Sequence, residues 1–172
     1  MLLDQRPRSQ QTSGDLRPLA IDAGSPTVPL RKILLPTDFS ACAAAAGVFA
    51  LELARSTGAG VTFVHIVHLP DWGHPNLAEW VTLSAKLLDG ASEALASLEE
   101  EARRSGVRVD SVANEGDPAR EIVRVASHAR ADLIVMGCQG KKGLDRIEQR
   151  IVGSVTQNVL RTAPCPVTVV RR

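Results

Sequence analysis

Short apolar runs rich in Val, Ile and Leu alternate along most of this sequence with longer helical stretches. Five such runs occur, KILLP, VTFVHIV, VRVDSV, DLIVM and PVTVV, and four helical segments separate them. β-branched residues favour strands, and continuous apolar runs are typical of strands buried on both faces of a parallel sheet. Strands that alternate with helices imply right-handed crossovers. The sequence therefore predicts a single α/β domain in which helices cover both faces of a five-stranded parallel sheet.

Element positions follow from these runs and from the residues that punctuate them. The predicted strands cover residues 32–36, 61–67, 107–112, 132–136 and 166–170, and the first two predicted helices cover 41–56 and 77–105. The pair Asp89-Gly90 either kinks or divides the second helix. Asp117 and Pro118 suit the N-cap and the first position of a third helix, and a fourth begins near Ser154.

The first 30 residues differ from the rest of the chain. They are rich in Gln, Ser, Pro, Gly and Arg and show no sustained periodicity, so they offer little apolar surface to offset the entropy of ordering. We predict a disordered tail over residues 1–30 and a folded domain over 31–172.

Composition and charge exclude several classes of protein. The net charge of +1 gives no reason to expect a nucleic-acid partner, and no apolar run approaches the ~18–20 residues that cross a bilayer. The amino terminus lacks the pattern of a secretory signal, so we predict a cytoplasmic protein without a membrane partner. The sequence has neither a GxSxG nucleophile elbow nor a Walker A motif, and we predict no catalytic residue.

The cysteines and histidines do not form a metal site or a disulfide framework. The three cysteines are far apart and form no CxxC pair, and Cys42 and Cys165 are interpreted as core residues. Cys138 is either a redox-sensitive thiol near the positive end of a helix or a small filler residue. His65, inside the second predicted strand, is interpreted as a hydrogen-bonded histidine rather than as a ligand.

Two of the turns that follow strands carry chemically useful residues. In open α/β sheets, ligands bind beyond the carboxyl ends of the strands, where the strand order reverses. Pro36-Thr37-Asp38-Phe39-Ser40 follows the first strand, and a glycine-rich segment from Gly137 to Gly153-Ser154 follows the fourth. Glycines allow backbone N–H groups to approach a phosphate, and the next helix adds its positive end. Asp38 suits a sugar or a base better than a phosphate, because like charges repel. Each feature also has a purely structural interpretation, as a turn or a helix cap.

Taken in order, these segments resemble the universal stress protein family. The resemblance covers residues 31–172 and is carried by RKILLPTDFS (31–40), VTFVHIV (61–67), NEGDPAREIVRVASHARADLIVMG (114–137) and GSVTQNVLRTAPCPVTVVR (153–171). ATP-binding members of the family have the pattern G-x2-G-x9-G-[S/T] after the fourth strand. Here twelve residues, not nine, separate Gly140 from Gly153. We align Gly137 and Gly140 with the first pair, which leaves three extra residues within 144–152.

The resemblance implies a strand order of 3-2-1-4-5 and a nucleotide site between strands 1 and 4. It implies ATP or a related adenine nucleotide, with or without Mg²⁺, as a regulatory ligand in a stress response with little or no hydrolysis. It also implies a homodimer formed through the C-terminal strand. Two alternatives stay open: a dimeric interaction module that binds no nucleotide, and a slow ATPase. The residues that the resemblance assigns to the nucleotide are Pro36, Thr37, Asp38, Val67, Met136, Gly137, Gly140, Gly153, Ser154, Val155 and Thr156.

Overall fold

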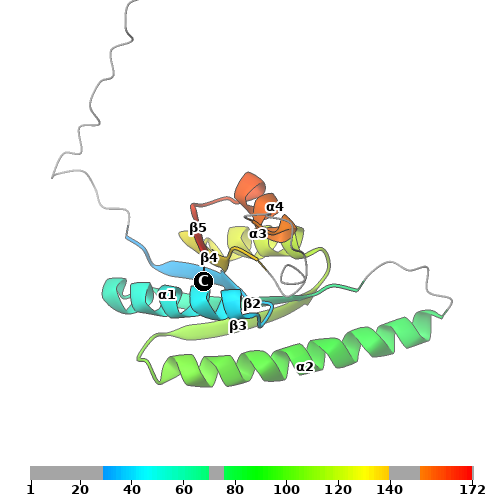
Figure 1. Ribbon diagram of the computed structural model, residues 1–172. Coiled ribbons are helices and arrows are strands. Elements are labelled where there is room, and N and C mark those ends of the chain that lie inside the picture. The colour runs from blue at the N-terminus through cyan, green and yellow to red at the C-terminus, as the bar shows by residue number, and fades with distance from the viewer. Residues whose placement is uncertain (1–28, 70–75, 140–151, 172) are drawn as a thin grey trace, which may run out of the picture.

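A computed structural model describes residues 29–69, 76–139 and 152–171. Within these residues the chain forms β1 (Lys32–Pro36), α1 (Ala41–Thr57), β2 (Gly60–Val67), α2 (Leu77–Arg103), β3 (Val109–Glu115), α3 (Pro118–Ala129), β4 (Leu133–Gly137), α4 (Ser154–Thr162) and β5 (Val167–Val170). The strands form one parallel sheet in the order β3-β2-β1-β4-β5. Helices α1 and α2 lie on one side of the sheet, and α3 and α4 lie on the other (Figure 1). The predicted α/β class and strand order are confirmed. The division at residue 30 stays a prediction, since residues 1–28 lie outside the described part.

Helix boundaries follow from local capping. The Ser40 side chain accepts a hydrogen bond of 3.2 Å from the Ala43 amide at the start of α1, and Gly58, with a φ of 74°, ends that helix. At the start of α3, Asp117 accepts a hydrogen bond of 2.9 Å from the Arg120 amide and Pro118 follows it. Both caps use residues that satisfy the otherwise unpaired amides of a first turn.

The core has one layer on each side of the sheet. Along β1, Ile33 and Leu35 pack toward α1 and α2, whereas Leu34 packs toward α3 and α4. On the first side, α1 contributes alanines, which allow the helix to lie close to the strands. On the second side, Ile122 of α3 and Val159 of α4 are buried against the sheet. This arrangement holds the start of α1 and the start of α4 at the same edge of the sheet as the end of β4.

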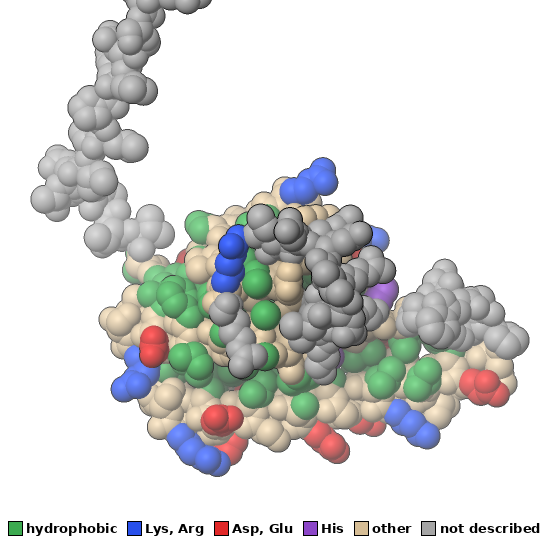
Figure 2. Space-filling model, in the orientation of Figure 1, with side chains coloured by type: hydrophobic (Ala, Val, Ile, Leu, Met, Phe, Trp, Pro, Cys, Tyr) green, Lys and Arg blue, Asp and Glu red, His purple; other side chains and the backbone are tan. Residues whose placement is uncertain are grey.

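Two predicted elements differ from the observed ones by more than a single residue at an end. Helix α2 runs without a break through Gly90, so the proposed division there is wrong. Figure 2 shows charged groups of both signs along the outer side of this helix and hydrophobic side chains at the surface nearby. The exposed hydrophobic side chains of α2 include Leu77, Val81, Leu83 and Leu87. Strand β3 begins two residues later than predicted and continues to Glu115, because it pairs with β2 from Val61↔Val109 to Val67↔Glu115. No helix among the described residues is long and apolar enough to span a membrane.

Candidate functional site

The order of the strands reverses between β1 and β4, which lie side by side. Ile33 is in register with Leu133, and Leu34 with Ile134. Strands β2 and β3 extend the sheet on the β1 side, and β5 extends it on the β4 side. This is the position at which open α/β sheets bind ligands. The predicted site residues that follow β1 and β4 therefore lie at one edge of the sheet.

The loop from β1 to α1 is held by its own hydrogen bonds. The Thr37 amide donates to the Val64 carbonyl at 2.8 Å, which continues the pairing with β2 for one residue. The Phe39 amide donates to Thr37 Oγ1 and the Ser40 amide donates to Asp38 Oδ1, both at 3.1 Å. Phe39 has a φ of 58°, an uncommon conformation for a bulky residue. The turn fixes the backbone of Asp38 at the end of β1, the strand that pairs with β4.

His65 contributes to this loop in a way that its position in β2 alone did not indicate. Its Nδ1 lies 2.8 Å from the Thr37 carbonyl oxygen, and since a carbonyl only accepts, Nδ1 carries the proton and donates. The His65 ring also packs on the Phe39 ring, with centroids 4.7 Å apart. The interpretation as a hydrogen-bonded histidine is confirmed, and the bond explains how the loop keeps its strained residue.

Replacing His65 by alanine is expected to lower the free energy of unfolding by about 1–3 kcal/mol, the sum of one hydrogen bond and one ring contact. His65→Asn is the matched control, because its amide nitrogen can replace Nδ1 as the donor to Thr37. Urea denaturation should therefore place His65→Asn between wild type and His65→Ala. Equal stability of all three proteins would show that the His65 bond does not support the loop.

The start of α4 is tied to the end of β4 by two hydrogen bonds. Thr156, which is buried, donates from Oγ1 to the Gly137 carbonyl at 3.1 Å, and the Gly153 amide donates to the Cys138 carbonyl at 2.7 Å. Gly153 is the N-cap and offers no side-chain hydrogen bond to the first turn. The first amides of a helix lack acceptors within the helix and carry partial positive charge. The first turn of α4 thus suits an anionic group at this edge.

Gly137 is required for the close packing of α1 on β4. A Cβ atom at this position would lie 2.8 Å from both the carbonyl carbon and the oxygen of Cys42, and 3.0 Å from its Cβ. The absence of a side chain therefore lets the first turn of α1 approach β4. The sequence left two interpretations of this glycine open, phosphate access and a turn, and the close approach of Cys42 is a structural reason that neither of them included.

The remaining predicted residues lie around the same edge, with one exception. Val67 is buried at the end of β2, where its carbonyl accepts a hydrogen bond of 3.1 Å from Gly116. Met136 is buried on the side of α3 and α4, and Val155 packs against the same cluster. Pro36 is buried, and Ser154 is exposed as the first residue of α4. Gly140 lies outside the described residues, so its predicted role is not placed.

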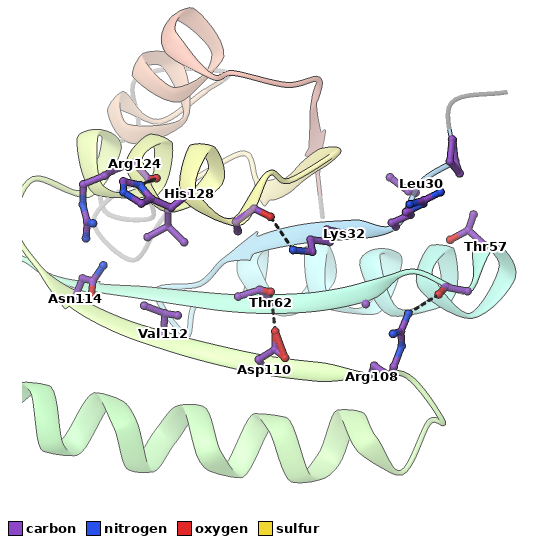
Figure 3. A pocket seen from close by; sticks show the side chains of 16 residues that line it. Leu30, Lys32, Thr57, Thr62, Arg108, Asp110, Val112, Asn114, Arg124 and His128 are labelled. Carbon is purple, nitrogen blue, oxygen red and sulfur yellow. Dashed lines mark hydrogen bonds between the residues drawn. The ribbon is translucent and has the colours of Figure 1, made fainter. Parts of the chain in front are cut away.

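A groove of about 930 Å³ lies elsewhere, between α3 and the face of β2 and β3 (Figure 3). Several of its polar side chains are hydrogen-bonded within the protein. Thr62 donates to Asp110 at 3.2 Å, Lys32 to the Ala129 carbonyl at 3.0 Å, and Arg108 to the Gly58 carbonyl at 3.2 Å. Lys32 begins β1, so the groove reaches the amino ends of the strands, away from the switch point. We assign no ligand to it.

Metal-binding side chains do not gather at the switch point. Over residues 29–69, 76–139 and 152–171, no three His, Cys, Asp or Glu residues are close enough together to hold a metal ion. Asp38 is the acidic residue that the β1–α1 loop contributes. The groups at this edge are helix amides, which suit an anion, a carboxylate, which suits hydroxyl or amino groups, and apolar side chains.

A parallel α/β sheet with a switch point between β1 and β4 defines a Rossmann-like domain. Comparison with known proteins is more specific, because the model of the universal stress protein family matches residues 29–171. The chain belongs to the universal stress protein family.

Individual relatives agree with this assignment. Universal stress protein MJ0531 of Methanocaldococcus jannaschii is 38% identical over 143 residues, which cover 83% of this chain and 82% of that protein. The solved structure of hypothetical protein MJ0577 is 32% identical with a TM-score of 0.74, and covers 84% of this chain and 98% of that one. The structure of a universal stress protein from Archaeoglobus fulgidus in complex with dAMP is 26% identical with a TM-score of 0.56, and covers 82% and 98%.

Proposed function

We propose that this protein binds ATP or a related adenine nucleotide as a regulatory ligand in a stress response, with little or no hydrolysis. The observation that carries the proposal is the meeting of two loops at one edge of the sheet. The β1–α1 loop brings Asp38 there, and the hydrogen bonds of Gly153 and Thr156 hold the uncapped start of α4 beside it. The Archaeoglobus fulgidus relative, which was solved with dAMP, supports an adenine nucleotide as the ligand class.

Each group of residues has a role in this proposal. The amides of Ser154, Val155 and Thr156 donate hydrogen bonds to the phosphates, with or without Mg²⁺, because the positive end of a helix stabilises anions. Asp38 accepts hydrogen bonds from the ribose hydroxyls or the adenine amino group. In this proposal the adenosine side is lined by Pro36, Thr37 and Val67. The ribose and phosphate side is lined by Met136, Gly137, Gly140 and Gly153.

The position that we propose for Asp38 also explains why we expect little or no ATP hydrolysis. Asp38, the carboxylate that we assign to the site, lies on the sugar and base side rather than beside the terminal phosphate. A general base must lie within hydrogen-bond reach of the water that it activates. We therefore propose a binding protein, and steady ATP hydrolysis that disappears in Asp38→Ala would favour the slow ATPase instead.

We also propose a homodimer formed through β5. This strand ends the sheet and pairs with β4 on one side, so its other edge presents backbone groups that another strand can pair with. A second copy of the same strand, related by a two-fold axis, would satisfy them. Sedimentation of the purified chain tests the dimer, and fractionation of cells that express it tests our proposed cytoplasmic location.

The binding proposal predicts that purified protein carries or takes up nucleotide. Acid denaturation followed by ion-exchange chromatography of the supernatant should release an adenine nucleotide. Alternatively, emptied protein should bind ATP, AMP or cAMP in calorimetry, with ATP measured both with and without Mg²⁺. Protein that is empty and binds none of them would leave the dimeric interaction module, which the longer Gly140–Gly153 spacing favours.

A further inference from the structure

Two of the three cysteines lie against each other although they are far apart in the sequence. Cys42 is in the first turn of α1, and Cys138 directly follows β4. The first turn of α1 packs on Gly137, the residue before Cys138, so closely that a Cβ atom at position 137 would lie 3.0 Å from the Cys42 Cβ. Burial raises the pKa of the Cys138 thiol, and the neighbouring Cys42 thiol raises it further through charge repulsion and a hydrogen bond. All three cysteines are free thiols in the structure.

The thiol pair lies at the centre of the site described above. Cys42 comes two residues after Ser40, at the end of the loop that carries Asp38. The backbone of Cys138 joins three elements: its amide donates to the Val170 carbonyl at 3.0 Å, and its carbonyl accepts from Gly153, the N-cap of α4, at 2.7 Å. A bond between the two side chains would therefore act on both loops that we assign to the nucleotide.

We propose that Cys42 and Cys138 are an oxidative modification site, which hydrogen peroxide converts to an intramolecular disulfide, and that this disulfide weakens nucleotide binding. The disulfide itself is inferred from the closeness of Cys42 and Cys138. Its effect on nucleotide binding rests on the proposed function, because the disulfide would link the two loops that we assign to the nucleotide.

The two thiols have different roles in the reaction. Cys42 is half-buried and accessible to peroxide, whereas Cys138 is only 8% exposed. The Cys42 thiol releases its proton, and the thiolate attacks one peroxide oxygen. The O–O bond breaks, and the hydroxide that leaves takes up the proton from Cys42, so the Cys42 sulfenic acid and one water form. The Cys138 sulfur then attacks the Cys42 sulfur, the S–O bond breaks, and the Cys138 proton leaves with the hydroxide as a second water. Two thiols and one peroxide thus give one disulfide and two waters.

The disulfide would change the geometry on which the phosphate site depends. A disulfide fixes the two Cβ atoms about 3.5–4.5 Å apart with a narrow range of torsion angles. Because the Cys138 carbonyl holds Gly153, a shift of Cys138 moves the first turn of α4 relative to Asp38. We expect the affinity for nucleotide to fall by about tenfold, within the range of ~5–150-fold that is typical of coupled sites.

Peptide mapping of the full chain tests the modification. Reduced protein is treated with stoichiometric hydrogen peroxide, alkylated, digested without reductant and analysed by mass spectrometry. We expect a Cys42–Cys138 linked peptide within monomeric chains and alkylated Cys165. Cys165→Ser is the matched control and should form the same disulfide, whereas Cys42→Ser and Cys138→Ser should not. Alkylation of both Cys42 and Cys138 after peroxide, or links only between chains, would overturn the proposal.

Calorimetry with the nucleotide found in the binding experiment tests the regulation. Oxidised wild-type protein should bind about tenfold more weakly than reduced protein, and dithiothreitol should restore the affinity. Peroxide should not change the affinity of Cys138→Ser. Equal affinities of the oxidised and reduced forms would overturn the regulatory part and leave the disulfide standing. Reduced protein that binds no nucleotide would refute the proposed function and the regulation with it, while the peptide map would still decide whether the disulfide forms.

Discussion

Replacing Gly137 by alanine should lower the free energy of unfolding by about 1–3 kcal/mol, the usual cost of forcing an extra methyl group into a packed core. The new Cβ would lie 2.8 Å from the carbonyl carbon and oxygen of Cys42. These are backbone atoms in the first turn of α1, so they cannot move aside without shifting the helix. Urea denaturation measures the loss, and the midpoint of thermal unfolding should fall by about 2–4 °C for each kcal/mol.

Gly90→Ala is the matched control for this variant. Gly90 lies inside α2, and a Cβ there would meet nothing within 4 Å. The same substitution should therefore stabilise the protein by about 0.5–1 kcal/mol, because alanine is the better helix former. Both variants lose the flexibility of glycine in the unfolded chain. The difference between their free energies of unfolding therefore reports mainly the contact with Cys42. If Gly137→Ala were as stable as Gly90→Ala, the close packing of α1 on β4 would be wrong.

Sequence signals within a few residues correctly predicted elements that are determined by neighbouring residues in the chain. Lys32–Pro36 forms the first strand as predicted, and Asp117 caps α3 as predicted. Strand β3 shows where such signals fail. The Val-rich start of VRVDSV suggested a strand over 107–112, but Asn114 and Glu115 also belong to it because they pair with Ile66 and Val67 of β2. Pairing with a neighbour outweighed the low strand propensity of Asn and Glu.

The sequence and the family resemblance predicted that the loops after β1 and β4 lie at one edge of the sheet, and the strand order confirms that placement. That a ligand binds there stays a prediction. Contacts between distant segments were not predictable. The bond from His65 to Thr37 joins residues 28 apart in the sequence, and the contact between Cys42 and Cys138 needs the absence of a side chain at Gly137. No local pattern encodes such contacts, since they depend on how two strands are placed side by side.

Removing the Asp38 carboxylate should weaken nucleotide binding by about 10–100-fold. A hydrogen bond to a charged group contributes about 1.5–3 kcal/mol, and each 1.4 kcal/mol is a factor of ten in Kd. Asp38 also accepts the Ser40 amide through Oδ1, so Asp38→Ala loses both the ligand contact and a bond that shapes the loop. Asp38→Asn keeps an oxygen for Ser40 and loses the charge. We therefore expect Asp38→Asn to bind about tenfold more weakly than wild type and Asp38→Ala more weakly still.

Calorimetry at fixed ionic strength compares these variants with Asp110→Asn, a matched change outside the site. Asp110 accepts a hydrogen bond from Thr62 in the groove on the face of β2 and β3, and its variant should keep the wild-type affinity. Whether the substitutions at Asp38 weaken or tighten nucleotide binding also shows which part of the nucleotide Asp38 faces. A carboxylate beside the phosphates would repel them, so its removal would tighten binding. Tighter binding by Asp38→Asn would place Asp38 on the phosphate side and refute its role toward the ribose and adenine.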